Sequence, residues 1–343
     1  MASHRRPKQP SRTRVTVLTA TAAAAVALTS QAAQAAPSAK PSKDEVKSKV
    51  DKLYEEAEKA TEKYNGAKEK QEKLEKQIGN LQDKVARGQD ELNDLRGGLG
   101  SMASAQYRTG GIDPSVQLFL SADPDDYLDK ASTLDQLSGQ QVEALKKIQE
   151  KQRSLSQQRQ EASDKLGDLA DTRTELGKKK KEVQGKLGEA QKLLNTLTAQ
   201  EKAALAEEDQ RASRASERSA LSSGKPASGF SGSAYGAAQS KIGSPYVYGA
   251  SGPGSFDCSG LTSWAFAQAG VTIPRTSQAQ ANAGTRIYSQ SDLQVGDLVI
   301  FYSDLHHVGF YAGGGQVLHA PRTGANVRYE SINNMPYQFG VRI

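Results

Sequence analysis

The chain is poor in cysteine and in aromatic residues: its 343 residues include one cysteine, one tryptophan and 6% aromatic residues in all. One cysteine cannot form a disulfide within the chain, so burial of apolar side chains and helix pairing must stabilise the fold. The thiol of Cys258 is either a small buried apolar group or a reactive group. Its neighbours in the sequence decide between these two interpretations.

An excess of charge of one sign is also missing once the first residues are set aside. The formal net charge is +6, but residues 1–35 contain five basic residues and no acidic one, so the remainder carries +1. Binding to nucleic acid needs a basic face, and no surplus of positive charge is left to form one. We therefore expect no nucleic-acid partner.

Long hydrophobic runs are scarce, and the stretch Val15–Leu28 follows a cluster of basic residues. It is shorter than the roughly 20 residues that span a bilayer, and residues 33–35 form a small-residue cleavage site. We predict a secretory signal peptide over 1–35 and a secreted protein, extracellular or associated with the cell wall, without a stable membrane span. The alternatives are an uncleaved anchor and a twin-arginine signal, but the prolines that follow Arg5-Arg6 favour the general secretory route.

Residues 36–208 show a 4-3 spacing of apolar residues, which predicts two long helices paired as an antiparallel coiled-coil hairpin. Glycines at 97, 98 and 100 and Pro114 interrupt this spacing, so we place the tip of the hairpin near residues 97–126. The predicted seam includes Val50, Ala57, Ala60, Ala67, Leu74, Ile78, Leu81 and Leu92 in the first arm and Leu145, Ile148, Leu155, Leu166, Leu169, Val183 and Ala190 in the second.

The composition then changes to serine, alanine and glycine, which predicts a flexible linker over residues 209–230. The remaining residues, 231–343, suffice for one small domain with its own core. A predicted helix comes first in this domain and predicted strands follow. The fold class is therefore multidomain, with an all-α coiled-coil hairpin followed by an α+β domain in which a helix packs on an antiparallel sheet.

Cys258 stands directly before a predicted helix that ends at Gly270, and Asp257 is a suitable N-cap. Free backbone N–H groups and the positive end of the helix dipole favour a thiolate over a thiol at this position. The same N–H groups suit the oxyanion of a tetrahedral intermediate. These features favour a nucleophilic role for Cys258 over a purely structural one.

Three histidines follow Cys258, and all of them lie in one short segment of predicted strands at 298–302, 307–312 and 316–320. A short hairpin loop would place His307 and His319 on the same face, one pair or one diagonal apart. Because Val308 and Phe310 need the core, the opposite face with His307 faces a cleft. We therefore predict that His307 is the base, that His319 orients it, and that His306 is a loop or edge residue.

A zinc site formed by Cys258, His307, His319 and Asp257 is an alternative. The ligand spacing is wide and uneven, which is unusual for zinc. We expect neither a metal nor another cofactor.

These residues resemble the NlpC-type family of papain-like peptidoglycan endopeptidases. Six blocks of residues carry the resemblance in the same order, and they are specific in combination. They are 243–249 (GSPYVYG), 257–261 (DCSGL), 274–277 (PRTS), 296–298 (GDL), 307–311 (HVGFY) and 319–321 (HAP). The sequence departs from the family mildly at Ala250, where a second glycine is usual, and at Tyr248, where tryptophan is frequent.

The resemblance implies a papain-like cysteine peptidase that hydrolyses the γ-D-glutamyl bond to the diamino acid in the stem peptides of peptidoglycan. It implies that Cys258 attacks, that His307 is the base and that His319 orients it. It also suggests three residues close to the substrate in the cleft. These are Tyr246, Asp257 and Ser259.

The coiled-coil region, residues 36–208, resembles less specifically the coiled-coil arms of division-associated wall hydrolases, including residues 107–111 (YRTGG) and 118–120 (LFL). The resemblance implies that the arms inhibit the enzyme or dock it on a membrane-anchored division complex. Two other functions remain open. One is a wall-binding adaptor that does not cut, and the other is an amidase or acyltransferase with the same thiol chemistry.

Overall fold

The computed structural model describes residues 41–108, 116, 120, 124–223 and 229–343. The predicted signal peptide lies outside these residues, and so do residues 109–115, 117–119 and 121–123 of the predicted hairpin tip. No helix in the described part of the chain is both long enough and apolar enough to cross a membrane.

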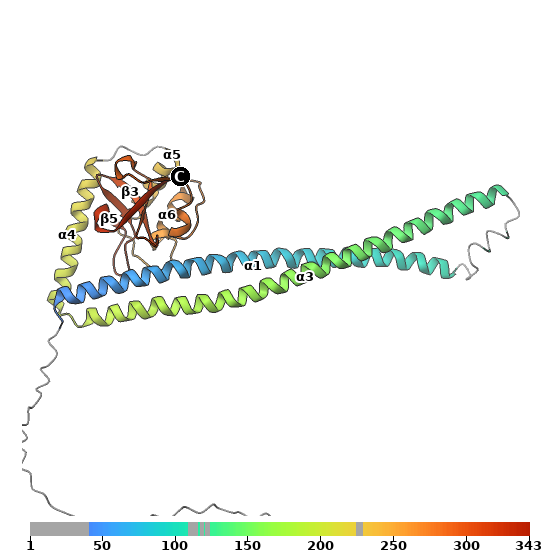
Figure 1. Cartoon of the computed structure of the whole chain (residues 1–343), viewed down its shortest axis with the longest axis horizontal. Coiled ribbons are helices and arrows are strands. Elements are labelled where there is room, and N and C mark those ends of the chain that lie inside the picture. Colours follow the sequence, from blue (N-terminus) through green and yellow to red (C-terminus); the bar gives the residue numbers. More distant parts are fainter. Residues whose placement is uncertain (1–40, 109–115, 117–119, 121–123, 224–228) are drawn as a thin grey trace, which may run out of the picture. The chain divides into compact units, whose positions relative to one another are not determined.

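Two long helices, α1 (Lys43–Arg108) and α3 (Pro124–Asn195), run side by side in opposite directions. Figure 1 shows this hairpin, and the buried clusters confirm its antiparallel pairing. Val46 and Val50 near the start of α1 pack with Ala190 near the end of α3. Farther along, Leu92 packs with Ile148 and Leu155.

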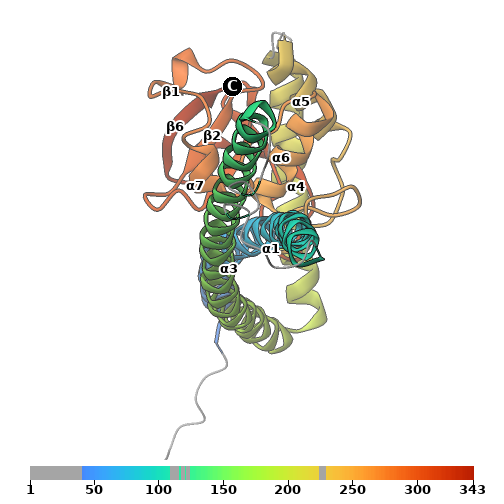
Figure 2. The same cartoon turned by 90° about the vertical axis from the view of Figure 1, so that its right-hand side faces the viewer.

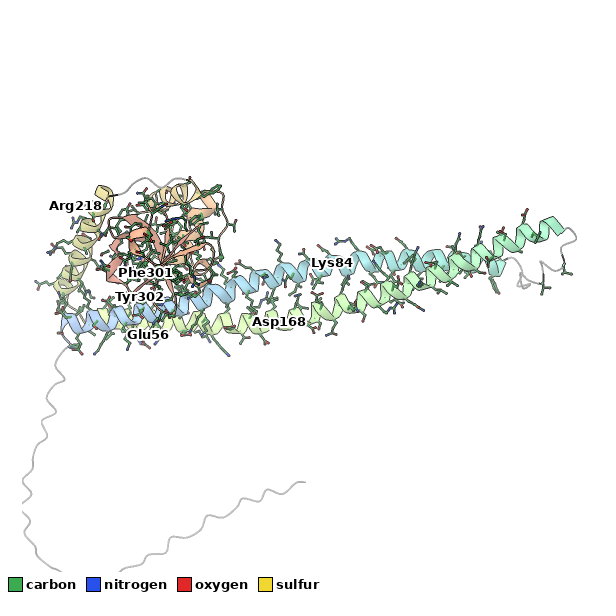
Figure 3. All side chains as sticks on the ribbon, turned by 45° about the horizontal axis from the view of Figure 1, so that its top comes forward. Glu56, Lys84, Asp168, Arg218, Phe301 and Tyr302 are labelled. Carbon is green, nitrogen blue, oxygen red and sulfur yellow. The ribbon has the colours of Figure 1, made fainter. Side chains whose placement is uncertain are left out.

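Polar residues cover the other faces of this hairpin, as Lys84 and Asp168 illustrate in Figure 3, and both are exposed. Two leucines of the predicted seam are also exposed. Leu145 is 48% and Leu166 50% exposed, so their assignment to the seam was wrong.

The helices end at other places than the glycine pattern predicted. α1 continues through the glycines at 97, 98 and 100 as far as Arg108. α3 ends at Asn195, and a new helix, α4 (Ala199–Ser223), occupies much of the segment predicted as a flexible linker. A capping box starts α4: Thr198 Oγ1 accepts from Glu201 N at 3.2 Å, and Glu201 Oε2 accepts from Thr198 N at 2.8 Å.

The last 115 residues of the chain form an α+β unit, as predicted. A six-stranded antiparallel sheet has the order β1-β6-β2-β3-β4-β5. Its strands are β1 (Thr285–Ile287), β2 (Leu298–Phe301), β3 (His307–Gly313), β4 (Gln316–His319), β5 (Arg328–Ser331) and β6 (Tyr337–Arg342).

Helices α5 (Gly229–Gln239) and α6 (Cys258–Gln268) pack together on one face of this sheet (Figure 2). Phe266 of α6 stacks on Phe310 of β3 with ring centroids 5.6 Å apart, and the core continues through Leu261, Val308 and Leu318. Each fully buried side chain of this size stabilises the unit by about 1.5–3 kcal/mol. The short helix α7 (Ser277–Gln280) follows α6, and α4 packs against β5.

Candidate active site

Cys258 is the first residue of α6, so its thiol lies at the start of a helix as predicted. Asp257 is the N-cap, and its Oδ1 accepts a hydrogen bond from Gly260 N at 2.7 Å. Gly260 has no room for a side chain, because a Cβ there would lie 2.1 Å from the carbonyl oxygen of Ala250. The tight packing of the loop on this first turn holds Cys258 in place.

The ionisation of Cys258 differs from the sequence-based expectation of a thiolate. Burial, the carboxylates of Glu62 and Glu58 and then that of Asp257 raise the pKa of the thiol well above its usual value. The helix start favours the anion, but in this arrangement the missing solvent and three nearby carboxylates outweigh it. Cys258 is therefore a neutral thiol in this state of the protein.

The structure brings His307 and His319 together one diagonal apart on β3 and β4. Their Nε2 and Nδ1 atoms lie 2.7 Å apart, and both rings are buried. Gly309 makes this possible, because a Cβ at that position would lie 2.8 Å from the Cβ of His319. Nδ1 of His307 faces away from His319, and a ring nitrogen of His307 lies within 4.8 Å of Cys258 Sγ.

His306 precedes β3 and does not share the face of His307 and His319. Its ring stacks on Tyr302 with centroids 4.1 Å apart, and its Nδ1 contacts the carboxylate of Asp304. Only its backbone carbonyl reaches the site, where it lies 3.8 Å from Cys258 Sγ.

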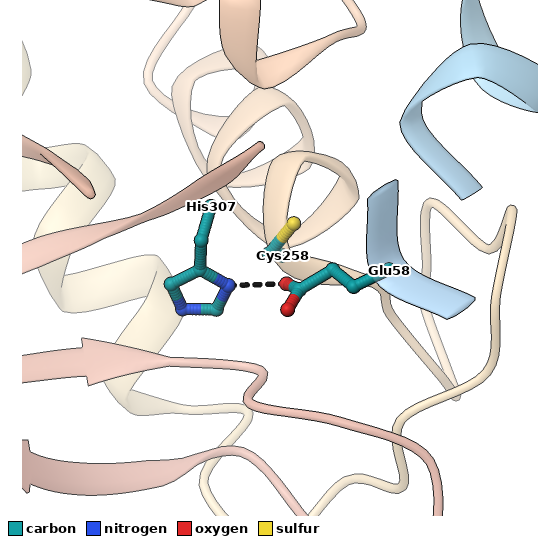
Figure 4. Close-up of side chains that lie close together, drawn as sticks. All are labelled: Glu58, Cys258 and His307. Atoms are coloured by element: carbon teal, nitrogen blue, oxygen red, sulfur yellow. Dashed lines mark hydrogen bonds and ion pairs between the residues drawn. The ribbon is translucent and has the colours of Figure 1, made fainter. Parts of the chain in front are cut away.

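Helix α1 contributes a carboxylate that the sequence-based site did not include. Oε1 of Glu58 contacts Nδ1 of His307, and Figure 4 shows this carboxylate beside the thiol of Cys258. Burial lowers the pKa of His307, but the carboxylates of Glu58, Glu330 and Glu62 together raise it by more, so the net shift is upward. The nitrogen that a general base would use is therefore occupied by an acidic side chain from the hairpin.

A second carboxylate of α1, that of Glu62, lies one helical turn farther along. It accepts hydrogen bonds from Ser259 Oγ at 2.7 Å and from Ser277 N at 2.8 Å. Cys258 Sγ lies 3.7 Å from the same carboxylate. Burial and the nearby charge of Asp257 raise the pKa of Glu62 to about 7.

Asp257 and Ser259, both predicted near the substrate, form one polar cluster with Arg275. Arg275 donates to Asp257 Oδ2 at 2.6 Å and to Ser259 Oγ at 2.8 Å. Asn65 of α1 reaches the same cluster and donates to Asp257 Oδ2 at 3.0 Å.

Tyr246, the third predicted cleft residue, is 6% exposed. Burial, followed by the charge of Glu58, raises the pKa of its hydroxyl well above the usual value. The structure thus brings all six predicted site residues into one buried region.

Comparison with known proteins agrees with the motif blocks. Residues 243–341 match the model of the NlpC/P60 family. These residues belong to the NlpC/P60 family. A probable endopeptidase of Corynebacterium glutamicum is 56% identical over 106 residues, which are 31% of this chain and 50% of that protein. A probable endopeptidase of Mycobacterium tuberculosis is 49% identical over 92 residues, 27% of this chain and 24% of that protein.

The chain therefore spans half or less of the length of these relatives. Among solved structures, the crystal structure of the NlpC/p60 domain of the peptidoglycan hydrolase SagA is 35% identical to the matched part. The match covers 33% of this chain and 98% of that one, with a TM-score of 0.31.

A metal-binding arrangement would involve Glu58 of α1 with Cys258 and His307 of the NlpC/P60 domain, whose donor atoms lie within 4.8 Å of one another. A carboxylate, a thiolate and an imidazole suit zinc. Zinc ligands must stand about 3 Å or more apart around the ion. The direct contact between Glu58 and His307 leaves no space for one between them, and the arrangement fits an ion pair instead.

A pocket of about 660 Å³ lies beside the histidines of the NlpC/P60 domain. Its walls come from α1, from Asp209 of α4, and from the sheet, where His307, His319 and Glu330 line it. Helix α1 covers the thiol, while the side of the site next to His319 faces this pocket.

Glu58, Glu62 and Asn65 were not among the site residues predicted from the sequence, and Arg275 was predicted only as part of a motif block. The three α1 residues share one stripe of the helix at intervals of four and three, and all are buried. A polar stripe of this kind has the same sequence pattern as a solvated helix face, so no local signal distinguishes the two.

Proposed function

We propose that the protein is a secreted cysteine endopeptidase that cleaves the γ-D-glutamyl–diamino acid bond in peptidoglycan stem peptides. One observation carries this proposal: Cys258 lies at the start of α6 beside His307, which in turn contacts His319 at 2.7 Å. A nucleophile, a base and a group that orients the base are the elements that thiol hydrolysis needs. The endopeptidase names of the relatives support the same reaction class.

In the proposed reaction His307 Nδ1 accepts the proton of Cys258 Sγ, and the thiolate attacks the carbonyl carbon of the γ-glutamyl bond. Backbone N–H groups in the first turn of α6 stabilise the oxyanion. His307 then protonates the leaving amine of the diamino acid. Water hydrolyses the acyl-enzyme with His307 again as base, which returns the thiol and releases a fragment that ends in D-glutamate.

We further propose that α1 holds the enzyme inactive in the arrangement described above. Glu58 occupies the nitrogen that would accept the proton, and Glu62 lies over the thiol. The raised pKa of Cys258 opposes formation of the nucleophile in the same state. Activity then requires that the hairpin move away, and a membrane-anchored division complex that docks on the hairpin is the partner we propose for this step.

The test is mass spectrometry of purified muropeptides after incubation with the Glu58→Ala/Glu62→Ala chain. We expect fragments that end in D-glutamate or isoglutamine, and none when Cys258→Ala is added to the same chain. Intact muropeptides from both chains would favour a wall-binding adaptor. Cleavage at the sugar–peptide junction, or transfer to an amine acceptor, would identify an amidase or an acyltransferase.

A further inference from the structure

An acidic residue on β5 lies next to the far side of His319. In the β4–β5 register Val317 pairs with Glu330 and His319 pairs with Arg328, so Glu330 is on the same face as His319, one diagonal away. Its Oε2 lies 3.3 Å from His319 Nε2. Within the described part of the chain, His319 Nε2 makes no hydrogen bond of good geometry. The acidic group that lies beside it is the carboxylate of Glu330.

The protons on the two histidines are linked by the contact between His307 Nε2 and His319 Nδ1, which share one hydrogen. His307 accepts the thiol proton only if its Nδ1 carries no hydrogen beforehand. The hydrogen of neutral His307 must then be on Nε2 and point to His319 Nδ1. His319 in turn must carry its hydrogen on Nε2, where it faces Glu330.

The opposite assignment would disable the base. If the hydrogen of His319 were on Nδ1, it would be donated to His307 Nε2, and the hydrogen of His307 would move to Nδ1. That nitrogen could then accept nothing from Cys258. The two tautomers of His319 therefore correspond to a competent and an incompetent His307.

An ionised carboxylate is an acceptor only, so it stabilises the competent arrangement. Burial raises the pKa of Glu330, but His319, Arg328 and Asn334 together lower it far below its usual range. Burial lowers the pKa of His319, which therefore stays neutral with a single hydrogen to place.

We propose that Glu330 is a positioning residue that acts through His319 to hold His307 in the tautomer that accepts the Cys258 proton. This inference rests on the proposed thiol peptidase function. It adds Glu330 as a fourth residue to Cys258, His307 and His319. Glu330 acts on the thiol only through the two histidines.

Glu330 also has partners that would give it a purely structural role. Its Oε2 accepts from Arg328 Nη2 at 3.1 Å, and its Oε1 accepts from Asn334 Nδ2 at 3.2 Å. Arg328 in turn pairs with Asp209 of α4 at 3.6 Å. The test must therefore include a readout that a structural ion pair would leave unchanged.

The experiment uses the full Glu58→Ala/Glu62→Ala chain as background and adds Glu330→Ala or Glu330→Gln. Nitrogen-15 NMR of the imidazole rings near pH 7.5 reports the tautomers directly. We expect the background to show His307 protonated at Nε2, and Glu330→Ala to shift both rings toward the Nδ1–H form. We also expect kcat on muropeptides to fall about tenfold to a hundredfold with KM nearly unchanged.

Glu330→Gln retains the shape and an acceptor oxygen, so its effects are expected to lie between those of the background and of Glu330→Ala. It also keeps the test valid if Glu330→Ala fails to fold. Asn334→Ala is the matched control, since it removes another partner of the same carboxylate without touching His319. We expect its tautomers and kcat to stay within twofold of the background.

Unchanged tautomers and kcat in both Glu330 variants would overturn the proposal and leave Glu330 a structural residue. Equal effects of Asn334→Ala and Glu330→Gln would overturn it as well. If the background chain itself cleaves no muropeptide, the proposed function fails. The ring tautomers still decide the role of Glu330 in that case, because they are measured without substrate.

Discussion

Helix α1 behaves differently in its first half and in its second half. Between residues 58 and 65 it buries the polar side chains of Glu58, Glu62 and Asn65, which contact the NlpC/P60 domain, in addition to its apolar contacts with α3. Beyond residue 68 its charged side chains are mostly exposed, and only the seam residues are buried. The same helix is thus a structural arm at one end and part of the candidate active site at the other.

This difference indicates where the hairpin contributes to function. Burial of a carboxylate is costly unless hydrogen bonds or ion pairs compensate for it, so a helix whose role is only structural has no reason to bury two. Glu58 and Glu62 are both buried, and their partners are His307, Ser259 and the backbone of Ser277. The partners of these carboxylates are the groups that would handle substrate.

The largest expected effect comes from removing both buried carboxylates. Glu58→Ala/Glu62→Ala breaks the contacts with His307, Ser259 and Ser277, each worth about 1–3 kcal/mol. We expect the alkylation rate of Cys258 by iodoacetamide to rise about a hundredfold, measured by mass spectrometry of the intact chain. Glu69→Ala, an exposed glutamate on the same helix, is the control and should leave the rate unchanged. Equal rates in all three chains would remove the functional distinction between the two halves of α1.

The second effect is a dependence on pH of the closed arrangement, in which α1 packs over Cys258 and His307. The pKa of Glu62 is about 7 in the closed arrangement against an ordinary 4.5, and the pKa of His307 is also raised. Both groups bind more protons when the site is closed, so closure is favoured at low pH and weakens as pH rises through these values.

We expect the alkylation rate of the native chain, divided by that of the Glu58→Ala/Glu62→Ala chain, to rise about tenfold between pH 5 and pH 8. Glu62→Gln should flatten the part of this rise that lies between pH 4.5 and 7. A ratio that stays constant across the range would contradict the proposed contribution of these two groups.

A smaller effect is expected from Asn65, whose uncharged amide donates to Asp257 Oδ2 at 3.0 Å and to Glu62 Oε1 on its own helix at 3.2 Å. Its loss is worth about 1 kcal/mol, so Asn65→Ala should raise the alkylation rate of Cys258 about fivefold. Comparing this alkylation rate with that of Glu58→Ala/Glu62→Ala shows how much Asn65 contributes relative to the two carboxylates. A rise as large as that of the double variant would mean that Asn65, and not the carboxylates, holds the helix on the site.

The smallest effect on the site is expected from the far part of the hairpin. Leu155 is 3% exposed and packs with Leu92, whereas Leu145 is 48% exposed. Leu155→Ala should lower the free energy of unfolding by about 2–4 kcal/mol, and Leu145→Ala by about 0.5 kcal/mol or less. Urea unfolding followed by circular dichroism measures both, and neither should change the alkylation of Cys258. Increased alkylation in Leu155→Ala would show that the two halves of α1 are coupled.

Local sequence patterns were sufficient to predict much of the secondary structure of this protein and the faces on which key side chains lie. Alternation in 307–312 placed Val308 and Phe310 in the core and His307 on the opposite face, because strand residues alternate between the two sides of a sheet. The N-cap Asp257 and the apolar residues after it located α6, since capping and helical spacing act over a few residues. The 4-3 spacing predicted the hairpin pairing for the same reason. The capping box at Thr198 was a local signal as well, and it marks the start of α4 that the serine- and alanine-rich composition concealed.

Contacts between distant segments were decided by the tertiary structure alone. Glu58 lies 249 residues before His307 in the sequence, and nothing in its surroundings distinguishes it from the exposed glutamates of the same helix. The neutral state of Cys258 likewise depends on burial and on carboxylates from α1, which outweigh the helix start that the sequence revealed. Secondary structure and the predicted nucleophile follow from short-range spacing, whereas the covering of the candidate active site depends on packing between elements that the sequence keeps far apart.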